Sequence, residues 1–236
     1  MFVVTIDGLA GCGKTSIAKA LAQKLNFKML NTGAIYRGIT CEYLKVYGEE
    51  MPTKEIIEKF VPSLDVKVEF FGEEQHVFVC GTDWTQKLRE EVVSNMTPPV
   101  SSFDILREKV RHIQRDFAEN YNCIVEGRDI GTVVLPNADC KFFFTASNEV
   151  RAKRRYEQMK DDKNCPPFEE ILKDIEKRDE IDRTREFGVM IPAKDAEIID
   201  NSNETFDETF SRCFNIVQNK MKKKSNWFAL FCYILF

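Results

Sequence analysis

A glycine-rich stretch near the start of the sequence carries its strongest chemical signal. It fits the pattern GxxxxGK followed by Ser or Thr without a gap, and it consists of Gly8, Leu9, Ala10, Gly11, Cys12, Gly13, Lys14 and Thr15. Glycines let a backbone wrap phosphate groups with its N–H groups pointing inward, and the helix that comes next adds its positive N-terminal end. In this pattern the lysine reaches the β- and γ-phosphates, and the hydroxyl of Thr15 can bind Mg²⁺. We therefore predict that residues 8–16, Ser16 included, hold the phosphates of a nucleotide.

This phosphate-binding loop also narrows the class of protein. No NKxD-type guanine motif follows it, and the 236 residues contain no long Walker B strand with a paired glutamate. The combination favours a small-molecule kinase over a switch GTPase or a mechanical ATPase. Cys12 lies inside the loop, where it either fills a position for a small side chain or carries a reactive thiol whose oxidation would block the site.

Composition and charge are those of an ordinary globular protein. Hydrophobic residues make up 43% of the chain and charged residues 31%, which argues against a disordered chain. The net charge of −4 gives no support to nucleic-acid binding. None of the eight cysteines forms a CxxC pair, and the chain starts without a secretory signal. We therefore expect free thiols, a cytoplasmic location and no nucleic-acid partner.

Strands and helices alternate in the manner of a parallel α/β sheet. An apolar strand over 2–6 leads through the glycine-rich loop to a helix over 16–25, and a strand over 27–30 and a helix over 33–47 come next. The sequence predicts further buried strands of the same sheet at 123–126, 141–145 and 197–200, and helices over 104–119 and about 204–222.

Two segments interrupt this alternation. Residues 64–80 alternate apolar and polar side chains around a Gly-Glu-Glu turn, which predicts a hairpin in a small insert. Residues 149–185 are dense in charge and broken by Pro166 and Pro167, which suggests a mobile helical hairpin. The predicted organisation is a core in three parts (1–60, 86–150 and 177–220), a β insert over 61–85, a lid over 151–176 and a Lys-rich, then apolar tail over 221–236.

Three further stretches resemble the signatures of one family. Asn31-Thr-Gly-Ala-Ile-Tyr-Arg37, Glu126-Gly-Arg-Asp-Ile-Gly-Thr-Val-Val-Leu-Pro136 and Arg178-Asp-Glu-Ile-Asp-Arg-Thr-Arg185 are similar to segments of the bacterial-type cytidylate kinases. The resemblance covers about residues 2–220 in the same order. It implies a P-loop kinase with a central parallel sheet, a small antiparallel β insert and a helical lid. It also implies transfer of the γ-phosphoryl group of ATP, with Mg²⁺, to CMP or dCMP.

Convergent cations are needed for such a reaction, because phosphoryl transfer is mostly positioning and charge neutralisation. Guanidinium groups match phosphate oxygens, and the resemblance assigns the acceptor phosphate to Arg37, Arg128 and Arg185. The expected catalytic residues are Lys14, Arg128 and Arg185. Arg151 or Arg155, in the basic run after the strand over 141–145, is expected to contact the donor phosphates. The alternative for that run is a solvated helix face.

The resemblance also assigns the groups that read the nucleoside. Cytosine offers an N4 amino donor, which an aspartate accepts, and the family pattern places Asp129 and Arg107 at the base. Thr32 is expected near the nucleotide, and Asp182 with Arg178 near the sugar hydroxyls. The alternative for Asp182 is an ion pair along its own helix.

Some residues depart from the family pattern. Leu9 stands where proline is usual, Asn31 replaces a frequent aspartate, and Pro98 occupies the position of a serine near the base. Proline at position 98 removes one hydrogen bond to the base, so a kinase that also accepts UMP is one alternative. A nucleotide-binding regulatory module with weak turnover is another, and the C-terminal tail is the one feature that favours it.

The tail has no counterpart in the resemblance. Lysines 220 and 222–224 precede ten apolar residues, Trp227 to Phe236, which as a helix would rise about 15 Å, half the thickness of a bilayer core. Contact with a membrane surface, packing on the protein, self-association and a tolerated extension all fit this pattern. We expect the protein to be a monomer.

Overall fold

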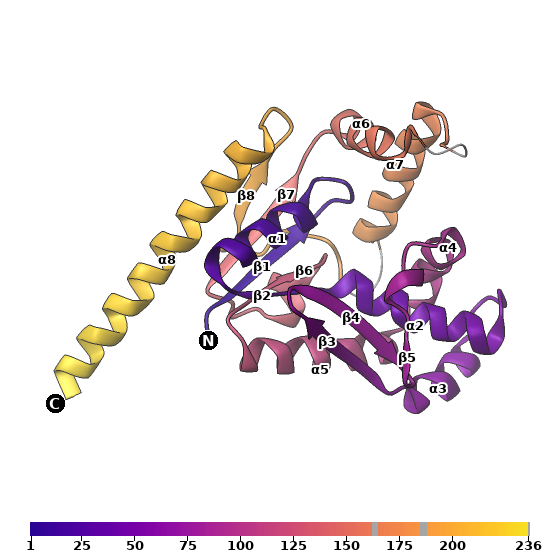
Figure 1. Cartoon of the computed structure of the whole chain (residues 1–236), viewed down its shortest axis with the longest axis horizontal. Coiled ribbons are helices and arrows are strands. Elements are labelled where there is room, and N and C mark those ends of the chain that lie inside the picture. The colour runs from indigo at the N-terminus through magenta and orange to yellow at the C-terminus, as the bar shows by residue number, and fades with distance from the viewer. Residues whose placement is uncertain (162–164, 185–187, 236) are drawn as a thin grey trace.

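A five-stranded parallel sheet forms the centre of the computed structural model, which describes residues 1–161, 165–184 and 188–235 (Figure 1). Its strands are β1 (Val3–Gly8), β2 (Lys28–Asn31), β6 (Cys123–Glu126), β7 (Cys140–Thr145) and β8 (Glu197–Asp200), in the order β2-β6-β1-β7-β8. The register aligns Ile6 of β1 with Glu126 of β6 and with Phe142 of β7. The α/β class and all five strands predicted for this sheet are confirmed.

Helices cover both faces of the sheet, because successive side chains of a strand point to opposite faces. In β6, Cys123 and Val125 pack into a core with helices α2 (Thr32–Tyr47) and α5 (Asp104–Asn120), while Ile124 packs into a second core. That second core includes side chains of α1 (Lys14–Leu25) and α8 (Phe206–Leu235), which lie on the same side of the sheet in Figure 1. All five carboxyl ends therefore reach one edge of a sheet that is buried on both faces.

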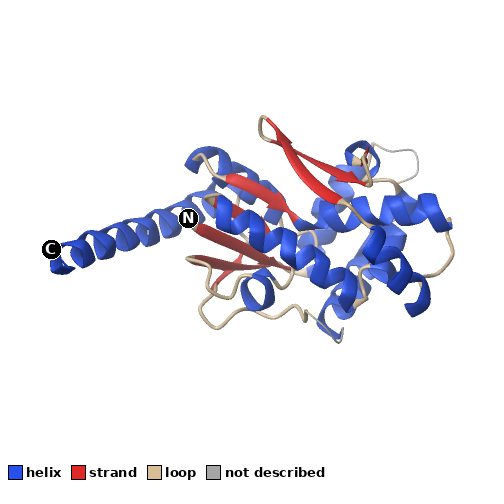
Figure 2. Ribbon diagram, turned by 90° about the horizontal axis from the view of Figure 1, so that it is seen from below, coloured by secondary structure: helices blue, strands red, loops and turns tan. Residues whose placement is uncertain are grey.

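The predicted hairpin is present inside a three-stranded antiparallel sheet. The small sheet consists of β3 (Val66–Phe71), β4 (Glu74–Val79) and the two-residue β5 (Thr82–Asp83). This sheet stands apart from the central sheet in Figure 2. Gln75 ties it to the main sheet, because its amide accepts from the N–H of Asn31 at 2.7 Å and donates to the carbonyl of Asn31 at 3.1 Å. Around it lie α3 (Lys54–Ser63), the 3₁₀ turn η1 (Thr85–Lys87) and α4 (Glu91–Val100).

The charged segment after β7 forms two helices, as predicted. Helix α6 (Asn148–Met159) packs against α7 (Phe168–Thr184) through Ala152, Ile171 and Ile175. Helix α7 continues past residue 176, so the predicted boundary between lid and core lies inside one helix. Closure of this hairpin stays a prediction.

Helix α8 is longer than the predicted helix over 204–222. It begins at Phe206 and continues through the lysines to Leu235, and in both views its last turns extend beyond the body of the molecule (Figures 1 and 2). Lysine is a good helix former, and neither glycine nor proline interrupts the stretch, so nothing in it ends the helix. Among the residues that the structure describes, no helix is both long enough and apolar enough to cross a bilayer.

Candidate active site

The glycine-rich loop connects the end of β1 to the start of α1 at the carboxyl edge of the sheet. Gly8 has a φ of +132°, and a Cβ there would lie 2.0 Å from the carbonyl oxygen of Phe144, so only glycine fits. The Lys14 side chain folds back into the loop, where its Nζ donates to the carbonyls of Gly8 at 2.9 Å and Leu9 at 2.6 Å. Burial, and then the charge of Arg128, lower the pKa of Lys14. The Lys14 amine therefore lies inside the loop, where the sequence motif predicts the phosphates.

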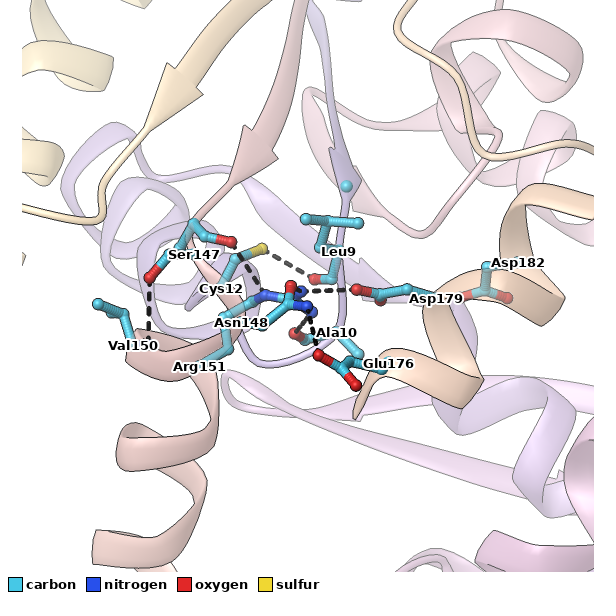
Figure 3. Close-up of polar contacts among 12 residues, drawn as sticks. Leu9, Ala10, Cys12, Ser147, Asn148, Val150, Arg151, Glu176, Asp179 and Asp182 are labelled. Carbon is cyan, nitrogen blue, oxygen red and sulfur yellow. Dashed lines mark hydrogen bonds and ion pairs between the residues drawn. The ribbon is translucent and has the colours of Figure 1, made fainter. Parts of the chain in front are cut away.

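Arg151 of helix α6 contacts the glycine-rich loop. This side chain is fully buried, and its guanidinium donates to the carbonyl of Ala10 at 3.0 Å and to the amide oxygen of Asn148 at 2.5 Å (Figure 3). It also forms an ion pair of 2.6 Å with Asp179 of α7. In this structure Arg151 therefore binds protein groups on three elements, and its contact with donor phosphates stays a prediction.

Asn201 holds the other side of the loop and was not anticipated from the sequence. Its side-chain amide donates to the carbonyl of Cys12 at 2.9 Å. Arg154 donates to the side-chain oxygen of Asn201 at 3.0 Å and to its backbone carbonyl at 2.9 Å. Asn201 directly follows β8 at the carboxyl edge, and that position was the one sequence signal for a role in the site.

Oxygen atoms suited to Mg²⁺ lie at the start of α1. The hydroxyl of Thr15 donates to Oε1 of Glu126 at 2.9 Å, while Oε2 of Glu126 is buried and has no hydrogen-bond partner among the described residues. Burial raises the pKa of Glu126, and the charge of Lys14 counteracts this. Asp7 lies in the same region and accepts from the N–H groups of Ile130 and Gly131, and burial raises its pKa to about 6. Mg²⁺ takes one or two protein oxygens beside phosphates and waters, so Thr15 and Glu126 fit it.

Arg37 lies within electrostatic reach of three other arginines. Arg37 of α2 donates to the carbonyl of Leu88 at 3.3 Å, and its pKa is lowered by burial and then by the charges of Arg89, Arg155 and Arg128. Such a concentration of like charge is costly unless an anion lies among the guanidinium groups. The structure thus brings Arg37 near Arg128 and Arg155, and a phosphate group needs such a group of cations. Arg89 joins them although no motif in the sequence gave it a role.

Arg128 is fixed by a residue from another element. Its Nε donates to Oδ2 of Asp182 on α7 at 2.8 Å. Burial lowers the pKa of Arg128, but the charge and hydrogen bond of Asp182, together with the charges of Cys12 and Glu126, raise it overall. The helix-internal partners considered for Asp182 are Arg178, whose side chain is not described, and Arg185, which lies outside the described residues.

Arg107 of α5 and Asp129, the residue after Arg128, form a buried ion pair of 2.7 Å. The Arg107 guanidinium lies over the ring of Tyr36, and its Nε is buried with no hydrogen-bond partner in the described parts of the chain. A Cβ on Gly188, whose φ is +65°, would lie 2.2 Å from Oδ2 of Asp129 and 2.4 Å from Nη2 of Arg107. Thr32 is also buried here, and its hydroxyl donates to the carbonyl of Glu126 at 2.7 Å. The Nε of Arg107 is thus an unpaired donor in a closely packed region, among the residues that the structure describes.

Removing one partner of this pair should destabilise the fold. We expect Arg107→Ala to lower the free energy of unfolding by about 3–5 kcal/mol, because it leaves the Asp129 carboxylate buried without its counter-charge. The double variant Arg107→Met with Asp129→Leu should recover most of that loss, since it removes both charges. Urea unfolding followed by circular dichroism measures both, with Lys109→Ala on the same helix as the control. A loss of under 1 kcal/mol for Arg107→Ala contradicts the expectation.

Comparison with known proteins points to one family. A family model described as cytidylate kinase matches residues 4–219. A cytidylate kinase of Clostridium botulinum (strain Loch Maree / Type A3) is 38% identical over 215 residues, which cover 91% of this chain and 97% of that protein. A cytidylate kinase of Caldicellulosiruptor bescii is 36% identical over 221 residues, covering 94% and 97%.

A solved structure shares the fold at much lower sequence identity. It is an uncharacterised protein from Eubacterium ventriosum, which aligns with a TM-score of 0.50 and 14% identity over 92% of this chain and 98% of that one. This likeness concerns the fold alone. The family match and the two relatives, each spanning nearly the whole chain, place this protein in the cytidylate kinase family.

Proposed function

We propose that this kinase transfers the γ-phosphoryl group of ATP to CMP or dCMP and releases ADP and CDP or dCDP. The observation that carries the proposal is the buried pair of Arg107 and Asp129, since Asp129 directly follows Arg128 and Arg107 lies over the ring of Tyr36, the neighbour of Arg37. The proposed site has three parts: the glycine-rich loop for the donor, the arginines for the acceptor phosphate, and the pair of Arg107 and Asp129 for the base.

The donor binds at the loop. The γ-phosphate draws the Lys14 ammonium away from the carbonyls of Gly8 and Leu9, to which it donates in this structure. Thr15 and Glu126 would hold Mg²⁺, which would supply positive charge beside the donor phosphates. Asn201 and Arg151 keep the loop in place while its own groups exchange partners.

The acceptor phosphate lies among Arg37, Arg89 and Arg128, with Arg185 as a predicted fourth cation. Arg155, whose charge also acts on Arg37, stays a predicted contact of the donor phosphates. One of its oxygens attacks the γ-phosphorus, the bond from that phosphorus to the β-phosphate oxygen breaks, and ADP leaves. A phosphate monoester has its second pKa near 6, so at neutral pH the attacking oxygen is already deprotonated and no general base is needed. The arginines therefore position the acceptor and offset the repulsion between two anions.

The base is read by Asp129 and Arg107. The carboxylate accepts from the N4 amino group of cytosine, and the free Nε of Arg107 supplies a donor to the same edge. Uracil would present a carbonyl oxygen to that carboxylate and leave both acceptors unpaired, which costs much more than a missing apolar contact. Asp182 and Arg178 are the predicted partners of the sugar hydroxyls. The predicted lid over 151–176 closes on the donor and excludes water.

A coupled assay of ADP release, with ATP, Mg²⁺ and one of four acceptors, tests the proposal. We expect kcat/KM for CMP and dCMP to exceed that for UMP and AMP by at least about 10²-fold, because the wrong base leaves buried polar groups unpaired. Asp129→Asn, which offers an amide where the carboxylate stood, should narrow the gap between CMP and UMP. Equal rates with UMP would show that the acceptor site is relaxed, and no turnover with any acceptor would favour the regulatory module.

Location and assembly belong to the proposal as well. The proposed reaction uses nucleotides of the cytoplasm, and the described cysteines carry free thiols, which fits a reducing compartment. A monomer stays our prediction, since the proposed site is built from residues of a single chain.

A further inference from the structure

Residues 220–236 take no part in the proposed reaction and lie outside the family match over 4–219. The structure nevertheless makes residues up to Leu235 part of helix α8, with no break at the end of the matched region. Figures 1 and 2 show these turns leading away from the body of the protein. Because the helix is continuous, its last turns project in a defined direction.

The direction is set by contacts at residue 224. The Lys224 Nζ donates to the carbonyl of Met1 at 2.9 Å and to Oδ1 of Asp139 at 2.6 Å, and it lies 5.5 Å from the ring centre of Phe2. Met1 and Asp139 lie just before the amino ends of β1 and β7. Helix α8 therefore leaves the body at the amino edge of the sheet, opposite the carboxyl edge that holds the site.

Beyond Asn226 the sequence is apolar throughout. Residues 227–236 read Trp-Phe-Ala-Leu-Phe-Cys-Tyr-Ile-Leu-Phe without a polar residue that could form a hydrated face. A helix that pairs with another in water shows an apolar stripe and a polar opposite face, whereas a helix apolar all round needs an apolar medium. At about 1.5 Å per residue the segment is about 15 Å long, which fits one leaflet of a hydrocarbon core about 30 Å thick.

Positive charge marks the boundary of this segment. Lys222 and Lys223 are exposed and form no salt bridge within the described part of the chain, while the protein as a whole carries a net charge of −4. Cations beside an apolar helix complement anionic lipid headgroups. Trp227, at the junction, is a residue type enriched where protein crosses from water to hydrocarbon.

We propose that the apolar segment, residues 227–236, inserts into one leaflet of a bilayer that contains anionic lipid, with Lys222 and Lys223 at the headgroups. The kinase is then held at the membrane surface. Because α8 leaves from the amino edge of the sheet, the carboxyl edge faces the aqueous phase and stays open to nucleotides.

Co-sedimentation of the full chain with phosphatidylglycerol/phosphatidylcholine vesicles tests this inference, with pure phosphatidylcholine vesicles as the comparison. We expect binding to the mixed vesicles that weakens as salt is added. Each lysine near an anionic surface strengthens binding about fivefold, so the variant Lys222→Gln with Lys223→Gln should bind about 25-fold more weakly. Phe228→Ser with Leu230→Ser and Phe231→Ser should abolish binding. Kinase activity in solution should be unchanged in both variants.

Tryptophan fluorescence gives a second readout that does not depend on turnover. The chain has two tryptophans, and Trp84 is buried in the body, so a blue shift on addition of mixed vesicles reports Trp227. The shift should disappear in Trp227→Phe. No sedimentation, or equal binding to both kinds of vesicle, overturns the proposal. So does a lipid-independent dimer in light scattering that dissociates in the triple serine variant, because the segment would then be covered by a second copy.

Discussion

Replacing Lys14 with methionine should lower kcat by about 10²–10³-fold, the usual cost of removing one charged donor at a site of developing negative charge. Methionine keeps the length of the side chain and removes its charge. The Lys14 ammonium donates to the carbonyls of Gly8 and Leu9, so it lies within the loop that we propose receives the phosphates. The same coupled assay of ADP release measures the loss.

A matched variant separates this effect from a general disturbance of the helix. Lys19 lies on α1 as well but is exposed, so Lys19→Met should keep both kcat and the free energy of unfolding. If Lys14→Met retained turnover within threefold of the unchanged chain, Lys14 would not stabilise the transferring group. A loss confined to the KM for ATP would instead assign it to ground-state binding.

The glycine-rich loop could be predicted from sequence because neighbouring residues specify its conformation. Gly8, Gly11 and Gly13 all have positive φ, and Lys14 begins the following helix, so the loop needs no distant partner to be recognised. Buried strands could be predicted for a related reason. Because β6 is covered on both faces, its residues Cys123–Val125 are all apolar, and such a run is visible in the sequence. The predicted bounds of β6 and β8 agree with the structure.

The supports of the loop could not be predicted, because they join residues far apart in the chain. Asn201 lies 189 positions from Cys12, and Arg151 lies 141 from Ala10. Asparagine and arginine are common surface residues, and no local pattern distinguishes one that binds a backbone carbonyl of another element. The same holds for Arg89, whose effect on Arg37 depends on how the loop before α4 packs against α2.

Short or irregular elements were missed for a different reason. Strand β5 has two residues, too few for an alternating pattern. Helix α4 carries Pro98 and Pro99 in its last turn, where prolines argue for a loop in sequence. Pro98 is exposed on this helix. The acceptor assay, rather than the sequence departure at this position, decides whether discrimination against UMP is relaxed.

Arg128→Ala should cause the largest loss of activity, about 10³-fold or more in kcat/KM for the acceptor, with the fold retained. Arginines that stabilise charge in phosphoryl transfer contribute factors of 10³–10⁵. Arg128 is suited to that role because its charge acts on both Lys14 and Arg37, and the Asp182 carboxylate holds its guanidinium in place. Arg128 is therefore near both Lys14 and Arg37, the residues to which the proposed reaction assigns the donor and the acceptor phosphate.

Three variants distinguish catalysis from support by Arg128. Arg128→Lys keeps a charge but loses the fork that donates to two oxygens at once, so its activity should fall between those of Arg128→Ala and the unchanged chain. Asp182→Asn frees the guanidinium without removing it and should raise the KM for CMP more than it lowers kcat. Arg183→Ala, at an exposed position of the same helix α7, should change neither. If Arg128→Ala kept turnover within tenfold while Asp182→Asn lost it, the acidic partner would be the functional residue and Arg128 its support.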